Sequence, residues 1–258
     1  MDTDKKISDR WEREKRLLLI VDGSISDSFY TSILLQRLEY DIYAAKTAED
    51  ALKIMTLTTP SLVLTEIALP RMSGLELLKH MKRNPQTDAV PVLIHTYEKN
   101  PQSEESCQRA GCAGYLVKPA DPNALYAAVQ SATEPTPRRV IRLKTHLGLI
   151  VEAEDTAKQS GDNECVTYLS ESGLYISTAN PLPPGTALPI VFSLKNIKIH
   201  VEGLVLYSFN QKSRPFGEYG MGLKFVRIGA EDRSLIRTFI IEQLTMNIAP
   251  KRKNSPPL

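Results

Sequence analysis

The stretch LVLTEIALPRMSG, residues 62–74, decides the fold of the first half of the chain. It begins with an almost wholly apolar strand, residues 62–66, and passes through a turn into an amphipathic helix predicted over residues 73–84. Short strands of this apolar kind are buried on both faces, as in a parallel sheet that helices cover on both sides. The same unit recurs before and after this stretch.

Four more strands and four more helices flank it. Strands are predicted over residues 16–21, 40–45, 90–96 and 114–117, and helices over 24–39, 47–59, 102–110 and 121–133. This strict alternation predicts an α/β fold with a doubly wound, five-stranded parallel sheet of the flavodoxin-like type. In such a sheet the functional side chains collect at the carboxyl ends of the strands.

The second half of the chain has a different pattern. The segment Glu134–Arg138 carries two prolines and ends the last helix, which indicates a linker. Beyond it, β-rich segments follow one another without helices between them, and they predict a small antiparallel barrel. An amphipathic helix is predicted over residues 231–246. The β segments are 140–144, 147–152, 166–169, 173–178, 187–193, 198–209 and 220–226.

A length of 258 residues fits two domains of ordinary size. We expect an N-terminal extension over residues 1–14, a first domain over 15–134, a linker over 135–139, a second domain over 138–248 and a flexible tail over 249–258. The composition, 42% hydrophobic and 24% charged, is that of a soluble globular protein. A charged N-terminus and the lack of long apolar runs predict neither signal peptide nor membrane span, and hence a cytoplasmic protein.

Charge is unevenly distributed. Residues 1–134 hold 16 basic and 19 acidic residues, and the remainder holds 16 basic and 11 acidic residues. The excess positive charge of the second half suits an anionic ligand, although solvated lysines and the basic tail explain it equally well. Three scattered cysteines and four scattered histidines predict no disulfide, metal site or acid–base pair. No basic recognition helix is present, so nucleic acid is not an expected partner.

Four residues stand where strands of the first domain end: Asp22, Glu66, Thr96 and Lys118. The strings LLLIVD, LVLTEIALPRMSG, PVLIHT and GYLVKP that carry them resemble the successive signatures of the response-regulator receiver domain. The resemblance implies two-component signalling in a bacterium. It also implies a Mg²⁺-dependent phosphoacceptor aspartate at the position that Glu66 occupies.

The sequence departs from that pattern at two positions. Gly23 replaces the second of two adjacent acidic residues that would hold Mg²⁺, and Glu66 replaces the acceptor aspartate. Mg²⁺ requires near-octahedral oxygen ligation, so with the loss of a carboxylate we do not expect this site to bind Mg²⁺. The longer glutamate displaces its oxygen by on the order of 1 Å in a reaction that depends on positioning. We therefore expect no useful phosphoryl transfer and a degenerate receiver, or pseudo-receiver.

Two interpretations of Glu66 stay open. Its carboxylate, pointed at Lys118 and the Thr96 hydroxyl, could hold permanently the negative charge that a phosphate supplies transiently. Alternatively, Asp22, Glu66 and Lys118 form only an ion cluster that keeps a vestigial pocket folded. Tyr115 stands at the position of the family's switch aromatic, where it is either locked inward or an ordinary half-buried strand tyrosine. By the same resemblance, residues 101–133 are the expected surface for a protein partner or a homodimer.

A second resemblance covers residues from Arg138 to about 246. Arg138 and Arg142 match the R-x-x-x-R motif of PilZ domains, with Arg139 as an extra donor, and Ser170 and Gly173 match the motif D/N-x-S-x-x-G. The resemblance implies binding of cyclic di-GMP. Arginine suits that ligand because its guanidinium fork pairs with guanine O6 and N7, stacks on purines and pairs with phosphate oxygens.

Tyr168 occupies the Asp/Asn position of that motif. A phenol cannot accept two hydrogen bonds from a guanine edge as a carboxylate does, which weakens the expected binding by about 2 kcal/mol. Tyr168 could compensate by stacking on a base, or it could be a cross-strand packing residue.

We therefore expect a non-enzymatic signalling effector that binds cyclic di-GMP and relays it to a protein partner, with a receiver that works independently of phosphorylation. The alternative is a nucleotide-independent scaffold for motility or polysaccharide machinery, in which both domains are degenerate. A phosphorylated response regulator would require chemistry that Gly23 and Glu66 do not support.

Overall fold

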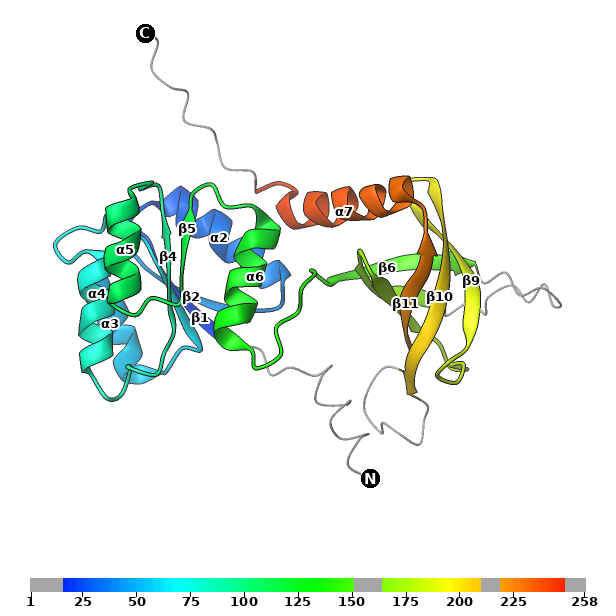
Figure 1. Ribbon diagram of the computed structural model, residues 1–258, viewed down its shortest axis with the longest axis horizontal. Helices are drawn as coiled ribbons and strands as arrows, with labels where there is room; N and C mark the ends of the chain where they lie inside the picture. The colour runs from blue at the N-terminus through cyan, green and yellow to red at the C-terminus, as the bar shows by residue number, and fades with distance from the viewer. Residues whose placement is uncertain (1–15, 151–163, 210–218, 249–258) are drawn as a thin grey trace, which may run out of the picture. The chain divides into compact units, whose positions relative to one another are not determined.

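The computed structural model describes residues 16–150, 164–209 and 219–248 of the chain (Figure 1). The chain divides into two compact units between Arg139 and Val140, and the second unit extends to Leu244. The extension predicted over residues 1–14 and the tail predicted over 249–258 lie outside the described residues.

The first unit is built on a five-stranded parallel sheet with the strand order β2-β1-β3-β4-β5. Because β1 pairs with β2 on one side and with β3 on the other, the order reverses at β1. Parallel strands end at the same edge of the sheet, so the residues after β1, β3, β4 and β5 meet there. The strands are β1 (Leu17–Val21), β2 (Asp41–Ala45), β3 (Leu62–Thr65), β4 (Val92–Thr96) and β5 (Gly114–Val117).

Five helices cover the sheet on both faces, with α2 and α6 on one face and α3, α4 and α5 on the other (Figure 1). The second group encloses a core in which strand residues such as Val63 and Ile94 pack with Met55, Leu77 and Cys107 of the helices. The helices are α2 (Ile25–Arg37), α3 (Ala48–Leu57), α4 (Gly74–Arg83), α5 (Pro101–Arg109) and α6 (Pro122–Thr133). The predicted doubly wound fold is confirmed.

The start of α4 fixes the loop that follows β3. Ser73 caps the helix, because its hydroxyl accepts a hydrogen bond from the Glu76 N–H while the Glu76 carboxylate accepts one from the Ser73 N–H. Gly74 is required beside it: a Cβ at this position would lie 2.1 Å from the carbonyl oxygen of Glu66. The deciding stretch of the sequence thus sets the backbone at the end of β3.

The second unit is a closed antiparallel barrel with the strand order β10-β11-β8-β7-β6-β9. Its strands are β6 (Leu143–Ile150), β7 (Cys165–Ser170), β8 (Gly173–Ser177), β9 (Ala187–Leu194), β10 (Ile197–Phe209) and β11 (Gly220–Ile228). The predicted small barrel is confirmed. One detail was wrong: the segments 140–144 and 147–152 were predicted as two strands, whereas β6 is continuous and only shifts register against β7 between Lys144 and Leu147.

The interior of the closed barrel forms the hydrophobic core of the second unit, because alternate side chains of each strand point inward. Val166, Ile176, Phe192 and Ile199 are fully enclosed in this way. The C-terminal helix α7 (Ala230–Thr245) buries Ile236, Ile240 and Leu244, which are spaced four residues apart on one stripe.

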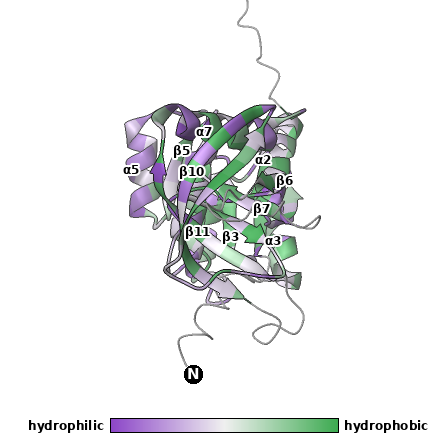
Figure 2. Ribbon diagram, turned by 90° about the vertical axis from the view of Figure 1, so that its right-hand side faces the viewer, coloured by the Kyte–Doolittle hydropathy of each residue, from purple (hydrophilic) through white to green (hydrophobic). Residues whose placement is uncertain are grey.

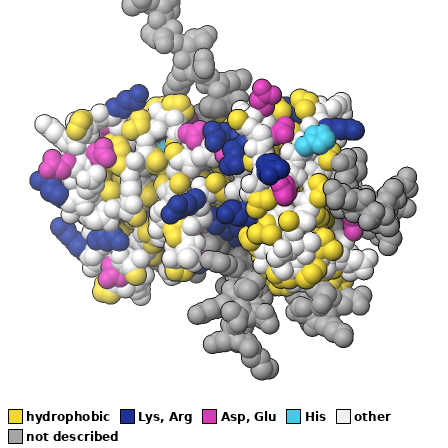
Figure 3. Space-filling view, turned by 45° about the vertical axis from the view of Figure 1, so that its right-hand side comes forward, with side chains coloured by type: hydrophobic (Ala, Val, Ile, Leu, Met, Phe, Trp, Pro, Cys, Tyr) yellow, Lys and Arg dark blue, Asp and Glu magenta, His cyan; other side chains and the backbone are white. Residues whose placement is uncertain are grey.

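The face of the molecule drawn in Figure 3 is mixed in character. Figure 2 shows that α5 is largely hydrophilic, and Figure 3 shows acidic and basic side chains interspersed with hydrophobic ones. Among the described residues, no helix combines the length and the apolar character needed to cross a membrane.

Candidate functional site

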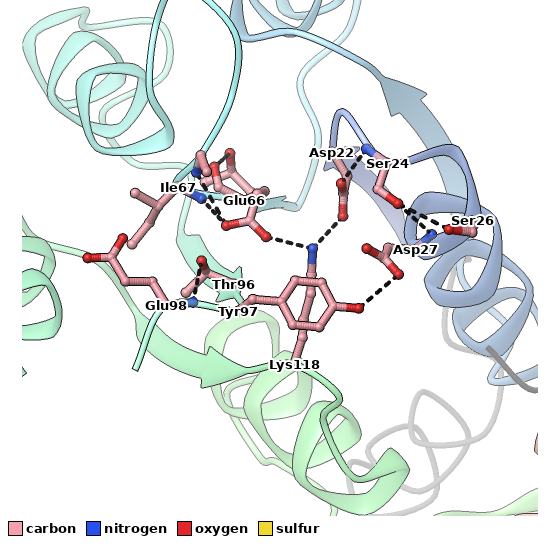
Figure 4. A network of polar contacts seen from close by, with 12 residues as sticks. Asp22, Ser24, Ser26, Asp27, Glu66, Ile67, Thr96, Tyr97, Glu98 and Lys118 are labelled. Carbon is pink, nitrogen blue, oxygen red and sulfur yellow. Dashed lines mark hydrogen bonds and ion pairs between the residues drawn. The ribbon is translucent and has the colours of Figure 1, made fainter. Parts of the chain in front are cut away.

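The strand ends of the first unit gather a buried ion cluster (Figure 4). Asp22 follows β1, Glu66 follows β3 and Lys118 follows β5, as the sequence pattern predicts. The Lys118 ammonium donates to Asp22 Oδ2 at 2.6 Å and to Glu66 Oε2 at 2.8 Å. All three residues are buried, with exposed fractions of 5%, 8% and 4% for Asp22, Glu66 and Lys118. One cation therefore neutralises part of the charge of two carboxylates away from water.

The two carboxyl groups respond differently to this environment. Burial raises the pKa of Asp22, and the hydrogen bond from Lys118 only partly offsets the effect. Burial also acts to raise the pKa of Glu66, but hydrogen bonds from Lys118 and Thr96 outweigh it, so that pKa is lowered. For Lys118 burial acts to lower the pKa, and the two carboxylates outweigh it and raise it. The cluster holds Glu66 ionised and Lys118 protonated.

Glu66 is also held by the backbone. Its Oε1 accepts hydrogen bonds from the N–H of Ile67 at 2.7 Å and of Ala68 at 3.3 Å. Asp22 similarly accepts from the N–H of Ser24 at 2.8 Å, which ties it to the start of α2. Both carboxylates thus have partners on each oxygen side and are fixed in position.

The residues at this site do not fit a Mg²⁺ ion. Gly23 supplies no oxygen ligand from its side chain, and Lys118 already binds an oxygen of both neighbouring carboxylates. Among the described residues, no group of three or more His, Cys, Asp or Glu side chains is placed to hold a metal ion.

Two residues that the sequence reasoning missed cover the cluster. Tyr97 places its ring 5.3 Å from the Lys118 ammonium, and its hydroxyl donates to Asp27 Oδ1 at 3.1 Å (Figure 4). Asp27 lies in the first turn of α2. Tyr97 could have been suspected from its position directly after β4, where other residues of the site lie. Its hydrogen bond to Asp27 could not be predicted, because the two residues are 70 positions apart.

Thr96 and Tyr115 lie beside the cluster. The Thr96 hydroxyl accepts from the N–H of Glu98 at 3.2 Å. Tyr115 is half-buried against the core, and its hydroxyl donates to the carbonyl oxygen of Glu98 at 2.9 Å. Burial raises the pKa of Tyr115 to about 12. Thr96 and Tyr115 therefore both contact Glu98, which lies in the loop between β4 and α5.

His95 adds an acid-sensitive element next to the cluster. It is 7% exposed, its Nε2 has no hydrogen-bond partner among the described residues, and burial together with the charge of Lys118 lowers its pKa to about 4. An unfolded chain protonates this imidazole near pH 6.5, whereas the folded chain resists until about pH 4. We expect the folded state to lose roughly 3 kcal/mol between these pH values, a loss that His95→Leu removes.

The measurement is the free energy of unfolding by urea at several pH values, with the imidazole followed by NMR. An imidazole that titrates near pH 6.5 in the folded protein would contradict the prediction.

The second predicted site involves both ends of the linker region. Arg138 and Arg139 lie at the end of the first unit, where the Arg138 N–H donates to Gln130 Oε1 at 3.0 Å, and Arg142 directly precedes β6 in the second unit. Arg139 is exposed, and Arg138 and Arg142 are half-buried.

Ser170, Gly173 and Tyr168 lie together on the β7–β8 hairpin. The Ser170 hydroxyl donates to the carbonyl oxygen of Gly173 at 2.9 Å, which closes the turn. A Cβ at Gly173 would lie 2.1 Å from the carbonyl oxygen of Leu223, so glycine is required for β8 to approach β11. Tyr168 is half-buried and pairs across the strands with Tyr175. Tyr168 is thus at least a cross-strand packing residue.

The turn of this hairpin is connected to the C-terminal helix. Glu171 accepts two hydrogen bonds from the Arg237 guanidinium of α7, at 2.9 and 2.7 Å. This pairing raises the pKa of Arg237 further above its usual value. This pair could not be predicted from the sequence, because the two residues lie 66 positions apart.

Comparison with known proteins identifies a family for each of the two units. The family model of the response regulator receiver domain matches residues 18–130, and that of the PilZ domain matches residues 138–242. A probable cyclic di-GMP phosphodiesterase of Vibrio cholerae is 36% identical over 102 residues, which are 40% of this chain and 23% of that protein. Protein PilH of Pseudomonas aeruginosa is 25% identical over 114 residues, 44% of this chain and 94% of that protein.

Among solved structures, the chemotaxis response regulator CheY4 of Vibrio cholerae is 28% identical, with a TM-score of 0.44 over 46% of this chain and 99% of that chain. The chain thus spans less than a quarter of the first relative and nearly the whole length of the receiver proteins. Two regulatory modules follow one another in this chain, which is a signalling protein made of a response regulator receiver domain and a PilZ domain.

Proposed function

We propose that this chain is a signalling effector that binds cyclic di-GMP through its PilZ domain and relays the binding to a protein partner. The PilZ match covers residues 138–242 and begins at the arginine motif. The observation that carries the proposal is the position of Arg142 directly before β6, in the same unit as the ordered hairpin of Ser170 and Gly173.

The chemistry of these residues suits a guanine dinucleotide with two phosphates. Arg142, with Arg138 and Arg139 from the linker, would pair with guanine acceptors and phosphate oxygens in bidentate fashion. Ser170 keeps its hydroxyl at the turn of the hairpin, where its oxygen also lies 3.4 Å from the N–H of Ser172. Tyr168 would contribute by stacking rather than by hydrogen bonding.

The effect of ligand binding could be passed on to the rest of the chain, because the proposed ligand residues lie next to the unit boundary and to α7. Arg138 and Arg139 are the last residues of the first unit before the boundary with the second, so a ligand that fixes them orders the chain at that boundary. The hairpin turn is held to α7 through Glu171 and Arg237, so a change at Ser170 would also reach α7. We further propose residues 101–133, which include α5 and α6, as the surface for a protein partner or for a homodimer.

The test is a calorimetric titration of the full chain with cyclic di-GMP, with cyclic di-AMP as the control ligand. Saturable, salt-sensitive binding of cyclic di-GMP alone is expected. Silence at tens of micromolar would favour the alternative, a nucleotide-independent scaffold, which the tyrosine at position 168 already favours.

We also propose that the receiver domain works without phosphoryl transfer. The Glu66 carboxylate is engaged by Lys118 and by two backbone N–H groups, and Asp22 shares the same ammonium. In this arrangement Glu66 supplies a permanent negative charge at the position of the acceptor. Thr96 and Tyr115, which both bond to Glu98, are the residues through which that charge would hold the β4–α5 loop.

Aspartate at positions 23 and 66 should restore phosphoryl transfer. A Cβ at Gly23 would meet only Lys46 O at 3.7 Å and Pro70 Cδ at 3.8 Å, so an aspartate fits there. We expect the double variant Gly23→Asp/Glu66→Asp to take up a phosphoryl group from acetyl phosphate and Mg²⁺, because it regains the metal ligand and the shorter acceptor.

Intact mass spectrometry reads the outcome, and the wild-type chain and Glu66→Asp are the matched controls. The wild type should stay unmodified. A wild-type chain that gains a phosphoryl group on Glu66 would overturn the proposal of phosphorylation independence.

A further inference from the structure

The first arginine of the PilZ motif is fastened to the receiver domain. Arg138 begins the residues that the PilZ family model matches, yet by its contacts it belongs to the first unit. Its backbone N–H donates to Gln130 Oε1 at 3.0 Å, and Gln130 Nε2 donates to the Tyr40 hydroxyl at 2.6 Å. Gln130 lies in the last turn of α6, and Tyr40 directly precedes β2. One side-chain amide thus links Arg138 to a helix and to the start of a strand.

The amide of Gln130 is buried, and both of its ends are hydrogen-bonded. Gln130 is 3% exposed and Tyr40 is 7% exposed. Breaking a hydrogen bond of a buried amide is costly, because water does not replace the lost partner. The bond from Arg138 to Gln130 is therefore a lasting connection, unlike the contacts of an exposed glutamine.

The segment before Arg138 is stiff and is held at its other end as well. Glu134 is the C-cap of α6, and its carboxylate accepts hydrogen bonds from Arg16 Nε at 2.7 Å and from Arg16 Nη2 at 3.5 Å. The Glu134 side chain is only 6% exposed. Pro135 and Pro137 fix φ at two of the three positions between Glu134 and Arg138. Because this short segment is held at both ends and has few free torsions, the receiver domain sets the position of the Arg138 backbone.

We propose that Gln130 is a positioning residue of the nucleotide site, which holds the backbone of Arg138 in place for cyclic di-GMP. The inference rests on the proposed binding of cyclic di-GMP and adds to it a residue outside the motif. Ordering the backbone of a residue costs conformational free energy. Here the fold of the receiver domain supplies that order before the ligand arrives, so the ligand has to order only the Arg138 side chain and the chain beyond it. Because such coupling is reciprocal, a ligand that binds Arg138 also stabilises the end of α6.

The test compares Gln130→Met with Gln130→Glu in the full chain by calorimetric titration with cyclic di-GMP. Methionine keeps the length of the side chain and removes both hydrogen bonds, so the Kd should rise about tenfold. Glutamate can accept from the Arg138 N–H and from the Tyr40 hydroxyl, so Gln130→Glu should bind nearly as tightly as the wild type. The matched control is Gln36→Met, the same substitution at an exposed position of α2, which should leave the Kd unchanged.

Hydrogen exchange separates this positioning role from a general loss of structure. In Gln130→Met the backbone amide of Arg138 should lose its protection, while the amides of β1 and β3 keep theirs. A protein that is destabilised throughout would lose protection at β1 and β3 as well.

The outcomes distinguish this inference from the proposed function. If the wild type does not bind cyclic di-GMP, both fail. If Arg142→Ala loses binding while Gln130→Met binds like the wild type, the positioning role alone is overturned. Equal weakening in Gln130→Met and Gln130→Glu would overturn it too.

A second variant decides the question should Gln130→Met fail to fold. Pro137 is exposed, so Pro137→Gly loosens the segment before Arg138 without touching the core. It should raise the Kd in the same direction as Gln130→Met. Wild-type affinity in Pro137→Gly would overturn the positioning role.

Discussion

Lys118→Met is expected to lower the free energy of unfolding of the receiver domain by about 3–5 kcal/mol at pH 7. The substitution keeps the apolar stem and removes the ammonium that binds Asp22 and Glu66. Two carboxylates would then remain buried beside each other without a cation, so each would lose a charge-assisted hydrogen bond and gain a repulsive neighbour. Urea unfolding of the full chain, with the receiver transition identified by hydrogen exchange at β1 and β3, measures the effect.

The loss of unfolding free energy in Lys118→Met should depend on pH in a defined direction. Without Lys118, burial loses its largest opponent, and we expect the folded-state pKa of both carboxyl groups to rise above the unfolded values even though the backbone hydrogen bonds remain. A raised carboxyl pKa means that the folded state takes up protons more readily, so the penalty is greatest at neutral pH and disappears as the pH falls below about 4. In the wild type the pKa of Glu66 is lowered, so its contribution runs the other way and is lost as the pH falls.

The control is Lys53→Met on α3. Lys53 pairs with Asp50 at 3.5 Å, but the two side chains are 80% and 50% exposed. An exposed pair of this kind contributes less than about 1 kcal/mol. A Lys118→Met protein as stable as this control, or one whose deficit grows toward acid pH, would show that the cluster is not the electrostatic centre described above.

The architecture was predictable because burial leaves a periodic trace in the chain. Strands such as Leu62–Thr65 are apolar throughout because helices cover them on both faces, and each helix of the receiver domain begins at a capping residue such as Ser73. The continuity of β6 was not predictable, because it depends on a register shift against β7 near Lys144. A register shift depends on how two strands pair, so the residues of neither strand indicate it on their own.

The charged residues of the candidate site were predictable from the sequence, but the side chains that cover them were not. Asp22, Glu66 and Lys118 follow three different strands, and the rule that parallel strands end at one edge brings them together. The cover of Tyr97 over Lys118 depends on side-chain orientation, which the sequence pattern does not encode. Gly222 of β11 shows the limit most clearly, since only the structure reveals that its missing Cβ makes room for the ring of Tyr207 on β10.

Arg142→Ala is expected to weaken the binding of cyclic di-GMP about a hundredfold. The position lies directly before β6, so its guanidinium belongs to the same unit as the hairpin of Ser170 and Gly173. A bidentate, charge-assisted contact of arginine with guanine or phosphate contributes about 3 kcal/mol, and each 1.4 kcal/mol changes the Kd tenfold. Because Tyr168 replaces an acid that would have shared the recognition of guanine, we expect the remaining arginine contacts to carry more of the affinity.

Arg233→Ala supplies the matched control, since Arg233 is an exposed arginine of α7 in the same unit. Removing it changes the net charge equally, so a loss of affinity confined to Arg142→Ala separates a specific contact from general electrostatic attraction. Equal, small effects of both substitutions would mean that the ligand is held only by the overall positive charge of this half of the chain. In that case the arginine motif would not recognise guanine, and the scaffold function would be the better explanation of a PilZ domain that carries a tyrosine at position 168.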